Sequence, residues 1–184
     1  MTRLSLAERI VALDGALDDI PHAFGGALAL AYYAEPRATI DIDLNLFVGV
    51  ERFPEVAERL VRIGATADDP NVAALIERDG QGRVLWDDTP VDLFFAYDAF
   101  HAAAAKARRT VPFADVTIPI LAPEHLVACK SVFNRSKDWV DIETMIATET
   151  AIDAAEVLRW VGRIVGDEDP RYERVAALLT RPRG

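Results

Sequence analysis

The segment from Ala38 to Val48 constrains the fold of this chain more than any other part of its sequence. Along it, polar and apolar residues alternate without a break. The polar set is Thr39, Asp41, Asp43 and Asn45, and the apolar set is Ile40, Ile42, Leu44 and Leu46. Alternation with a period of two is typical of a β-strand that has one face in a packed core and the other face on something polar. We therefore expect a strand here, in a sheet that is covered on its apolar side.

Two aspartates share the polar face of this predicted strand. Asp41 and Asp43 are two residues apart, so their Cα atoms should lie roughly 6.6 Å from each other, which is twice the rise of a strand. Two carboxylates at that separation repel each other and are costly to desolvate. A divalent cation removes both penalties, and Mg²⁺ prefers carboxylate oxygens combined with phosphates and water. The alternative is a pair of solvated carboxylates on an open strand face.

A third aspartate, Asp92, lies in the otherwise apolar segment 91–95. A carboxylate buried in such a segment needs a paired charge or a metal ion. If this segment forms the neighbouring strand, Asp92 would complete a three-carboxylate site with Asp41 and Asp43. The alternative is an edge strand from which Asp92 faces water.

The remaining periodicities predict an α/β (α+β) fold with a mixed sheet flanked by helices in residues 1–121, and a helical region in residues 122–184 packed on that core. Helices are expected at 6–17, 27–34, 54–63 and 99–108, and strands at 22–24, 83–86, 90–97 and 116–121. Beyond these, the pattern is helical at 123–133, 137–148, 154–165 and 171–179. The spacing of Ser5 and Glu8 is that of a capping box for the first helix.

Charge and cysteine usage restrict the environment and the partners. Residues 1–100 hold 8 Lys and Arg against 18 Asp and Glu, whereas residues 101–184 hold 12 of each, so the net charge of -10 comes from the first part. Such a chain repels phosphate backbones at long range, which disfavours extended nucleic-acid binding but not one nucleic-acid end near Arg135 and Lys137. The single cysteine excludes an internal disulfide, and no apolar stretch approaches the roughly 20 residues of a membrane span. We expect a cytoplasmic protein that does not interact with membranes.

Two further features suggest a phosphate ligand. Gly25 and Gly26 precede a predicted helix, where free N–H groups and the positive helix end can face a phosphate, although a glycine pair is more often only a tight turn. Lys130 shares an apolar helix face with Leu126 and Phe133, so its ammonium group should either reach water or meet an anion. For Asp138 and Asp141 we expect positions in the first turn of a helix, where acidic residues are favoured, and Asp138 is equally consistent with a binding role.

Two blocks of sequence resemble the polymerase-β-type nucleotidyltransferase superfamily, and more narrowly its minimal toxin-like branch of abortive-infection and MenT-type enzymes. The first block is the glycine pair, a short helix, Arg37-Ala-Thr39 and Asp41-Ile-Asp43, with Asp92 as the later acidic residue. The second block, residues 121–143, is similar to the pattern Leu-x-Pro-Glu-x-Leu, a lysine, and Arg-x-Lys-Asp-x-x-Asp. Together with Asp92, the blocks span residues 24–143.

The resemblance implies roles for the matching positions. Asp41, Asp43 and Asp92 would ligate Mg²⁺, two ions in all, with Mn²⁺ as a substitute. The implied catalytic residues are these three aspartates and Lys130, with Asp92 also able to accept the proton of the attacking hydroxyl. The implied nucleotide-binding residues are Gly25, Gly26, Arg37, Thr39, Lys130 and Asp138.

We therefore expect a metal-dependent transfer of a nucleoside monophosphate from a nucleoside triphosphate to a hydroxyl acceptor, with release of pyrophosphate. The acceptor could be a tRNA 3′ end, a protein or a small molecule, and the toxin-like resemblance suggests a toxin with an antitoxin partner. The alternative function is a non-catalytic nucleotide-binding or partner-binding module that retains the fold.

Overall fold

The computed structural model describes residues 4–148 and 151–180. The described residues form two compact units, the first containing residues 4–28 and 38–121 and the second containing residues 29–37, 122–148 and 151–180. Each unit is considered by itself below. Within the described ranges, no helix is both long enough and apolar enough to span a bilayer.

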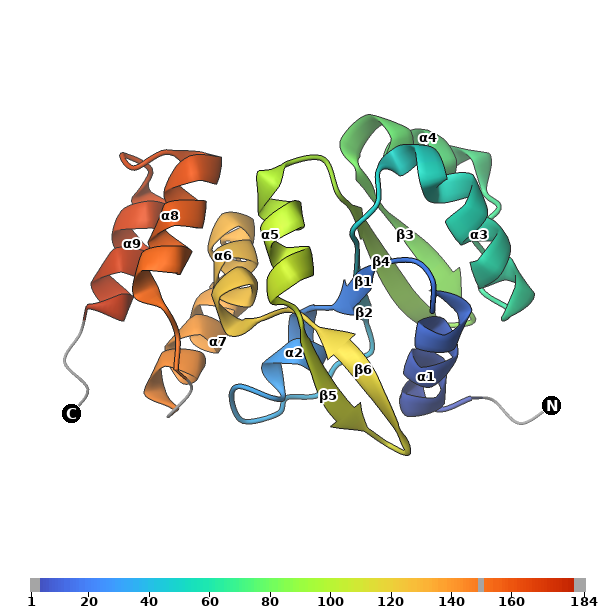
Figure 1. Ribbon diagram of the computed structural model, residues 1–184, viewed down its shortest axis with the longest axis horizontal. Coiled ribbons are helices and arrows are strands. Elements are labelled where there is room, and N and C mark those ends of the chain that lie inside the picture. Colours follow the sequence, from blue (N-terminus) through green and yellow to red (C-terminus); the bar gives the residue numbers. More distant parts are fainter. Residues whose placement is uncertain (1–3, 149–150, 181–184) are drawn as a thin grey trace. The chain divides into compact units, whose positions relative to one another are not determined.

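The first unit is built on a six-stranded mixed sheet with the order β3-β4-β2-β1-β6-β5 (Figure 1). The strands are β1 (His22–Phe24), β2 (Ile42–Leu46), β3 (Gln81–Trp86), β4 (Thr89–Phe95), β5 (Arg109–Phe113) and β6 (Val116–Ile120). The pairs β2/β4 and β1/β6 are parallel, and the other three neighbouring pairs are antiparallel. The predicted mixed sheet is therefore confirmed.

Strand β2 has the buried apolar face that the sequence predicts, although Asn45 on the opposite face is buried as well. Ile42, Leu44 and Leu46 are buried, because their side chains face the core. The strand is shorter than the predicted segment, since it begins at Ile42 and Asp41 precedes it. The same alternation continues in β4, where Val91, Leu93 and Phe95 are buried while the residues between them are half-buried.

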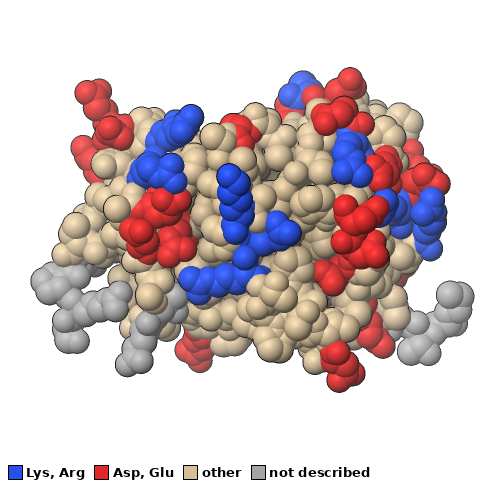
Figure 2. Space-filling model, in the orientation of Figure 1, with Lys and Arg blue, Asp and Glu red and all other residues tan. Residues whose placement is uncertain are grey.

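Helices of the first unit pack beside this sheet. They are α1 (Leu6–Ala16), η1 (Val50–Arg52), α3 (Phe53–Arg62), α4 (Pro70–Asp79) and α5 (Ala99–Ala107). The predicted capping box opens α1, because the Ser5 hydroxyl accepts from the Glu8 N–H and the Glu8 carboxylate accepts from the Ser5 N–H. The apolar face of α1 buries Ile10 and Leu13. On the face shown in Figure 2, acidic and basic side chains alternate over α3 and α4, in keeping with ion pairs such as Arg62–Glu58 and Arg78–Asp79.

The structure differs from the sequence prediction at three elements. Helix α2 (Gly26–Leu30) is shorter than the predicted 27–34, because the chain turns after Leu30. Helix α4 and strand β5 were not expected. Strand β5 contains Pro112, and it lies at the edge of the sheet, where a residue without an N–H is tolerated.

The second unit contains a group of helices together with the segment 29–37. Its helices are α6 (Pro123–Phe133), α7 (Ser136–Ala147), α8 (Ala154–Val165) and α9 (Pro170–Leu179). Helix α6 packs against the other three helices. The core of this unit includes Leu126, Ile142 and Val161. Residues 29–37 are tied to this unit where the Thr148 hydroxyl donates to the Tyr33 carbonyl at 2.7 Å.

Candidate active site

Asp43 and Asp92 are direct neighbours on the sheet. They are Cα partners in the parallel register of β2 and β4, so their side chains leave adjacent strands on the same side. Strand β4 lies between β3 and β2, so Asp92 is on an interior strand. The alternative of an edge strand for Asp92 is therefore wrong.

Arg83 on the edge strand β3 is paired with Asp92. The two residues are opposite each other in the antiparallel register of β3 and β4. The guanidinium group donates to both carboxylate oxygens, with Nε to Oδ1 at 2.6 Å and Nη2 to Oδ2 at 2.8 Å. Its Nη2 also lies 3.9 Å from Oδ2 of Asp41. The hydrogen bond to Asp92, together with the negative charges of Asp92, Asp41 and Asp43, raises the pKa of Arg83 further above its ordinary value.

The Gly25–Gly26 turn lies against Asp43. The Gly25 N–H donates to the Asp43 carbonyl at 2.9 Å. Gly26 has φ +52°, and a Cβ atom built on it would be 1.7 Å from Oδ2 of Asp43. This close approach leaves space only for glycine, so the turn and the carboxylate share one location in the first unit.

Asp41 is held at the entrance to β2 by a threonine. The Thr39 hydroxyl accepts from the Asp41 N–H at 3.2 Å and is 3.3 Å from the Asp41 carbonyl. This reciprocal contact fixes the backbone just before the strand. The predicted pair Asp41 and Asp43 is therefore present, with Asp43 inside the strand and Asp41 one residue before it.

The donor set of the first unit suits a hard divalent cation. Asp41, Asp43 and Asp92 supply carboxylate oxygens, which Mg²⁺ prefers, and the Arg83 guanidinium provides positive charge beside them. Over residues 4–148 and 151–180, no three His, Cys, Asp or Glu side chains are gathered closely enough to form a ready-made metal site. The structure thus brings Asp92 and Asp41 to the Arg83 guanidinium group, with Asp43 beside Asp92 in register, and the described residues do not gather the three carboxylates into an enclosed cage.

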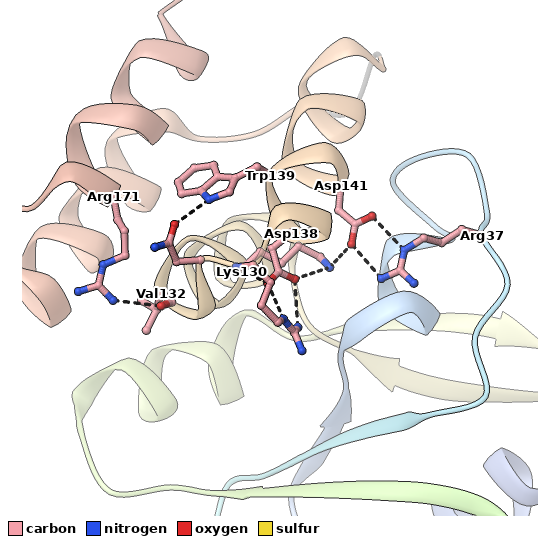
Figure 3. Close-up of polar contacts among 9 residues, drawn as sticks. Arg37, Lys130, Val132, Asp138, Trp139, Asp141 and Arg171 are labelled. Atoms are coloured by element: carbon pink, nitrogen blue, oxygen red, sulfur yellow. Dashed lines mark hydrogen bonds and ion pairs between the residues drawn. The ribbon is translucent and has the colours of Figure 1, made fainter.

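Asp141 connects two predicted binding residues in the second unit (Figure 3). Arg37 donates to Asp141 through Nε and Nη2, both at 3.0 Å, and Lys130 donates from Nζ to Oδ2 at 2.6 Å. Lys130 and Asp141 have side chains only 4% and 5% exposed, so this ion pair is buried. Burial acts to raise the pKa of Asp141, but the hydrogen bonds from Arg37 and Lys130 and their charges outweigh it and lower that pKa.

Asp138 is fully buried at the start of α7. It accepts from the Arg135 backbone N–H at 3.1 Å and from the Arg135 guanidinium at 2.7 and 3.0 Å. Lys130 Nζ is 3.9 Å from Oδ1 of Asp138, the oxygen that accepts from Nη2 of Arg135. The expected place of Asp138 in the first turn of a helix is confirmed, and the same carboxylate belongs to the network around Lys130.

A family profile described as "Nucleotidyl transferase AbiEii toxin, Type IV TA system" matches residues 11–182. The chain belongs to the AbiEii nucleotidyltransferase family. The toxin-like nucleotidyltransferase resemblance of its two motif blocks is thereby confirmed. Among curated protein sequences, none matches the chain.

Solved structures agree with the AbiEii assignment at the level of the fold. The antibiotic-resistance factor ANT(2'')-Ia, in solution, has a TM-score of 0.56 and 16% identity, over 93% of this chain and 89% of that one. Its crystal structure in complex with adenylyl-2''-tobramycin has the same TM-score and identity, over 94% and 95% of the two chains. A nucleotidyltransferase-like protein from Paracoccidioides brasiliensis has a TM-score of 0.48 and 15% identity, over 94% and 92%. The first two matches show a nucleotidyltransferase fold.

The sequence reasoning missed two residues of this AbiEii-family chain. Arg83 could have been found from the hairpin, because a two-residue turn at Asp87 and Asp88 places residue 83 opposite residue 92. Asp141 was expected only as an acidic residue near a helix start, whereas it accepts from Arg37 and Lys130. Arg37 and Asp141 are 104 residues apart in the sequence, so no local sequence pattern could indicate their contact.

Proposed function

We propose that this AbiEii-family protein transfers a nucleoside monophosphate from a nucleoside triphosphate to a hydroxyl acceptor and releases pyrophosphate. The observation that carries the proposal is the register of β2 and β4, which sets Asp43 beside Asp92 next to the glycine turn. In this reaction, the acceptor oxygen forms a bond to the α-phosphorus, and the bond between the α-phosphorus and the oxygen bridging it to the β-phosphorus breaks. Pyrophosphate leaves with that bridging oxygen, and the acceptor hydroxyl loses its proton.

Asp41, Asp43 and Asp92 would hold the divalent cations, two Mg²⁺ ions or Mn²⁺ in their place. When bound, such ions neutralise phosphate charge and stabilise the attacking and leaving oxygens. Asp92 would also accept the proton of the acceptor hydroxyl, which is a general-base role. In the turn, Gly25 and Gly26 would let a phosphate approach the backbone, with Thr39 supporting Asp41.

For Arg37, Lys130 and Asp138 we propose nucleotide binding, as the sequence resemblance implies. The network of the second unit contains three cations, with Arg135 as the third, and two carboxylates, Asp138 and Asp141. It therefore carries a formal charge of +1, which favours an anionic ligand. Asp141 would act as a positioning residue, because it orients both Arg37 and Lys130.

The acceptor is proposed to be an RNA 3′ end, such as that of tRNA, a protein hydroxyl or a small molecule, and the protein is proposed to act in the cytoplasm. The family description supports a toxin role, and with it an antitoxin partner. The acidic first part of the chain favours an acceptor with a small contact area over an extended RNA.

The test is nucleotide transfer by the purified protein. Each of the four α-labelled nucleoside triphosphates would be incubated with Mg²⁺ and three acceptor pools: total tRNA, a protein extract and a panel of aminoglycosides. We expect labelled acceptor and equimolar pyrophosphate with at least one combination. Asp43→Asn should reduce the rate by roughly 100-fold or more, whereas Asp79→Asn, in the exposed pair with Arg78, should leave it unchanged.

Absence of label transfer and of pyrophosphate with every nucleotide and pool would contradict the proposal. Equal rates for the wild type and Asp43→Asn would contradict the assignment of the site, even if transfer occurs.

A further inference from the structure

Arg83 is hydrogen-bonded to both oxygens of the Asp92 carboxylate, which the proposed reaction needs. Each Asp92 oxygen accepts one hydrogen bond from the guanidinium group, at 2.6 and 2.8 Å. Each oxygen keeps a lone pair that is not directed at Arg83, but a cation bound there would lie next to the guanidinium charge. Repulsion between these two positive charges favours displacement of the guanidinium group when Asp92 ligates a cation.

The position of Arg83 relative to the other carboxylates is that of a shared counter-ion. Its Nη2 atom donates to Asp92 and lies 3.9 Å from Oδ2 of Asp41. Asp43 is the register partner of Asp92 on the next strand. One guanidinium group therefore contributes positive charge where three negative groups lie near each other, which is the electrostatic contribution that a divalent cation would also make.

Arg83 can leave this position without disrupting the core. Its side chain is 53% exposed, and it projects from β3, the edge strand of the sheet. An arginine side chain with that exposure can turn its charged end into water. The Asp92 side chain is 21% exposed and sits on an interior strand, so it is the less mobile partner.

We propose that Arg83 is a positioning residue that serves as the resident counter-ion of the three carboxylates and competes with the divalent cation for Asp92. This inference rests on the proposed function, because the competing cation is the one that the reaction uses. Without the cation, Arg83 neutralises Asp92 and offsets repulsion from Asp41 and Asp43. When the cation binds, the guanidinium group releases Asp92 and turns toward solvent.

A purely structural ion pair between β3 and β4 would behave differently. It would affect the free energy of unfolding and would weaken cation binding only through its charge, so Arg83→Lys, which keeps that charge, would have the cation affinity of the wild type. Competition, in contrast, predicts tighter cation binding in Arg83→Lys as well as in Arg83→Gln, because the paired hydrogen bonds that the cation has to displace are lost in both variants. Cation affinity is therefore the measurement that separates the two roles.

The experiment measures Mn²⁺ binding to the full-length protein by calorimetry and by the electron paramagnetic resonance signal of free Mn²⁺. We expect Arg83→Gln to bind Mn²⁺ about tenfold more tightly than the wild type at low ionic strength, since one positive charge beside the site is removed. Arg83→Lys keeps the charge but loses the paired hydrogen bonds, so its affinity should be intermediate. The matched control is Arg78→Gln, which removes an arginine from the exposed pair with Asp79 and should not change the affinity.

An equal or weaker affinity in Arg83→Gln overturns the inference. An affinity of Arg83→Lys equal to that of the wild type also overturns it, and this variant decides the question alone if Arg83→Gln fails to fold. Asp43→Asn separates this failure from failure of the proposed function. If the wild type binds Mn²⁺ through Asp43 and Arg83→Gln has no effect, only the role of Arg83 is wrong. If neither the wild type nor Arg83→Gln binds Mn²⁺, both proposals are overturned.

Discussion

Gly26 and Asp43 approach each other so closely that a Cβ atom on Gly26 would lie 1.7 Å from Oδ2 of the aspartate. The backbone of Gly26 also has φ +52°, a conformation that side chains disfavour. Two independent constraints therefore require glycine at this position. Both act on the carboxylate that is paired in register with Asp92.

The first prediction concerns Gly26→Ala. The added methyl group must displace the Asp43 carboxylate or the turn, and the positive φ adds strain, so we expect a loss of about 1–3 kcal/mol in the free energy of unfolding. Mn²⁺ should also raise the melting temperature less than it does in the wild type, because Asp43 is moved. Differential scanning fluorimetry and urea unfolding measure both effects.

Gly15→Ala is the matched control for that substitution. Gly15 lies in α1, and a Cβ atom there meets nothing within 4 Å. Replacement should stabilise the helix by roughly 0.5–1 kcal/mol, because glycine is a poor helix former. If Gly26→Ala were as stable and as responsive to Mn²⁺ as Gly15→Ala, the proposed role of the turn would be wrong.

The second prediction concerns Arg9, which supports the hairpin that carries Arg83 and Asp92. Arg9 is buried in α1, donates to the Thr89 hydroxyl and to Asp87 at 2.6 Å, and lies over the Trp86 ring at 5.7 Å. These three partners are in or beside the turn between β3 and β4. Arg9→Met leaves the buried Thr89 hydroxyl without this donor, so we expect a loss of about 1–3 kcal/mol. Urea unfolding gives this value.

Hydrogen exchange tests the location of the effect. In Arg9→Met, the amides of β3 and β4 should lose more protection than those of β5 and β6. Arg62→Met is the comparison, because Arg62 pairs with Glu58 on an exposed face and should change stability by less than about 1 kcal/mol. Equal losses in the two variants would argue against a supporting role for Arg9.

Local sequence patterns were sufficient for much of the first unit. The alternation around Asp43 predicts β2 and its buried face, and the spacing of Ser5 and Glu8 predicts the start of α1. Helix α4 was missed although Asp69 caps it and Pro70 opens it, because Ile76 is its only buried residue among those described and its apolar stripe is correspondingly weak. Strand β5 was missed because Pro112 is unusual in a strand away from a sheet edge.

Local sequence patterns identify only some residues of the candidate site. Asp41 and Asp43 were found because both lie on one face of one strand, and a polar face is visible in a short segment. Arg83 and Asp141 were not found, because their importance comes from partners on other elements, Asp92 in one case and Arg37 and Lys130 in the other. A charged residue looks like a solvated one in sequence until its pairing is known.

The third prediction concerns the buried pair of Lys130 and Asp141. Asp141→Leu leaves the Lys130 ammonium group buried without its closest carboxylate, so we expect a loss of about 3–5 kcal/mol at neutral pH. The double variant Lys130→Met/Asp141→Leu should be more stable than the sum of the single losses predicts, because no unpaired buried charge remains from this pair. Urea unfolding of the four proteins gives the coupling energy, and additive losses would contradict a direct interaction.

The ion pair of Lys130 and Asp141 also predicts that the free energy of unfolding depends on pH. The pKa of Asp141 is lowered in the folded protein, so its contribution to stability is present above the unfolded value of about 4 and is lost as pH falls through the lower folded value. The stability difference between the wild type and Asp141→Asn should therefore narrow below about pH 4. A difference that stays constant from pH 7 to pH 3 would show that ionisation of Asp141 does not stabilise the fold.

The last prediction concerns His125, which is buried in α6 with its ring 6.3 Å from the ring of Trp160 in α8. Burial lowers the pKa of this imidazole, so the folded protein keeps it neutral where the unfolded chain, with a pKa of about 6.5, already binds a proton. The contribution of His125 to stability should therefore fall as pH decreases below about 6.5, by up to about 1.4 kcal/mol for each pH unit until the folded value is reached. His125→Leu removes the titrating group and keeps an apolar side chain against Trp160, so its free energy of unfolding should change less between pH 7.5 and pH 5. Parallel slopes for the wild type and His125→Leu over this interval would show that the imidazole titrates alike in the folded and unfolded chains.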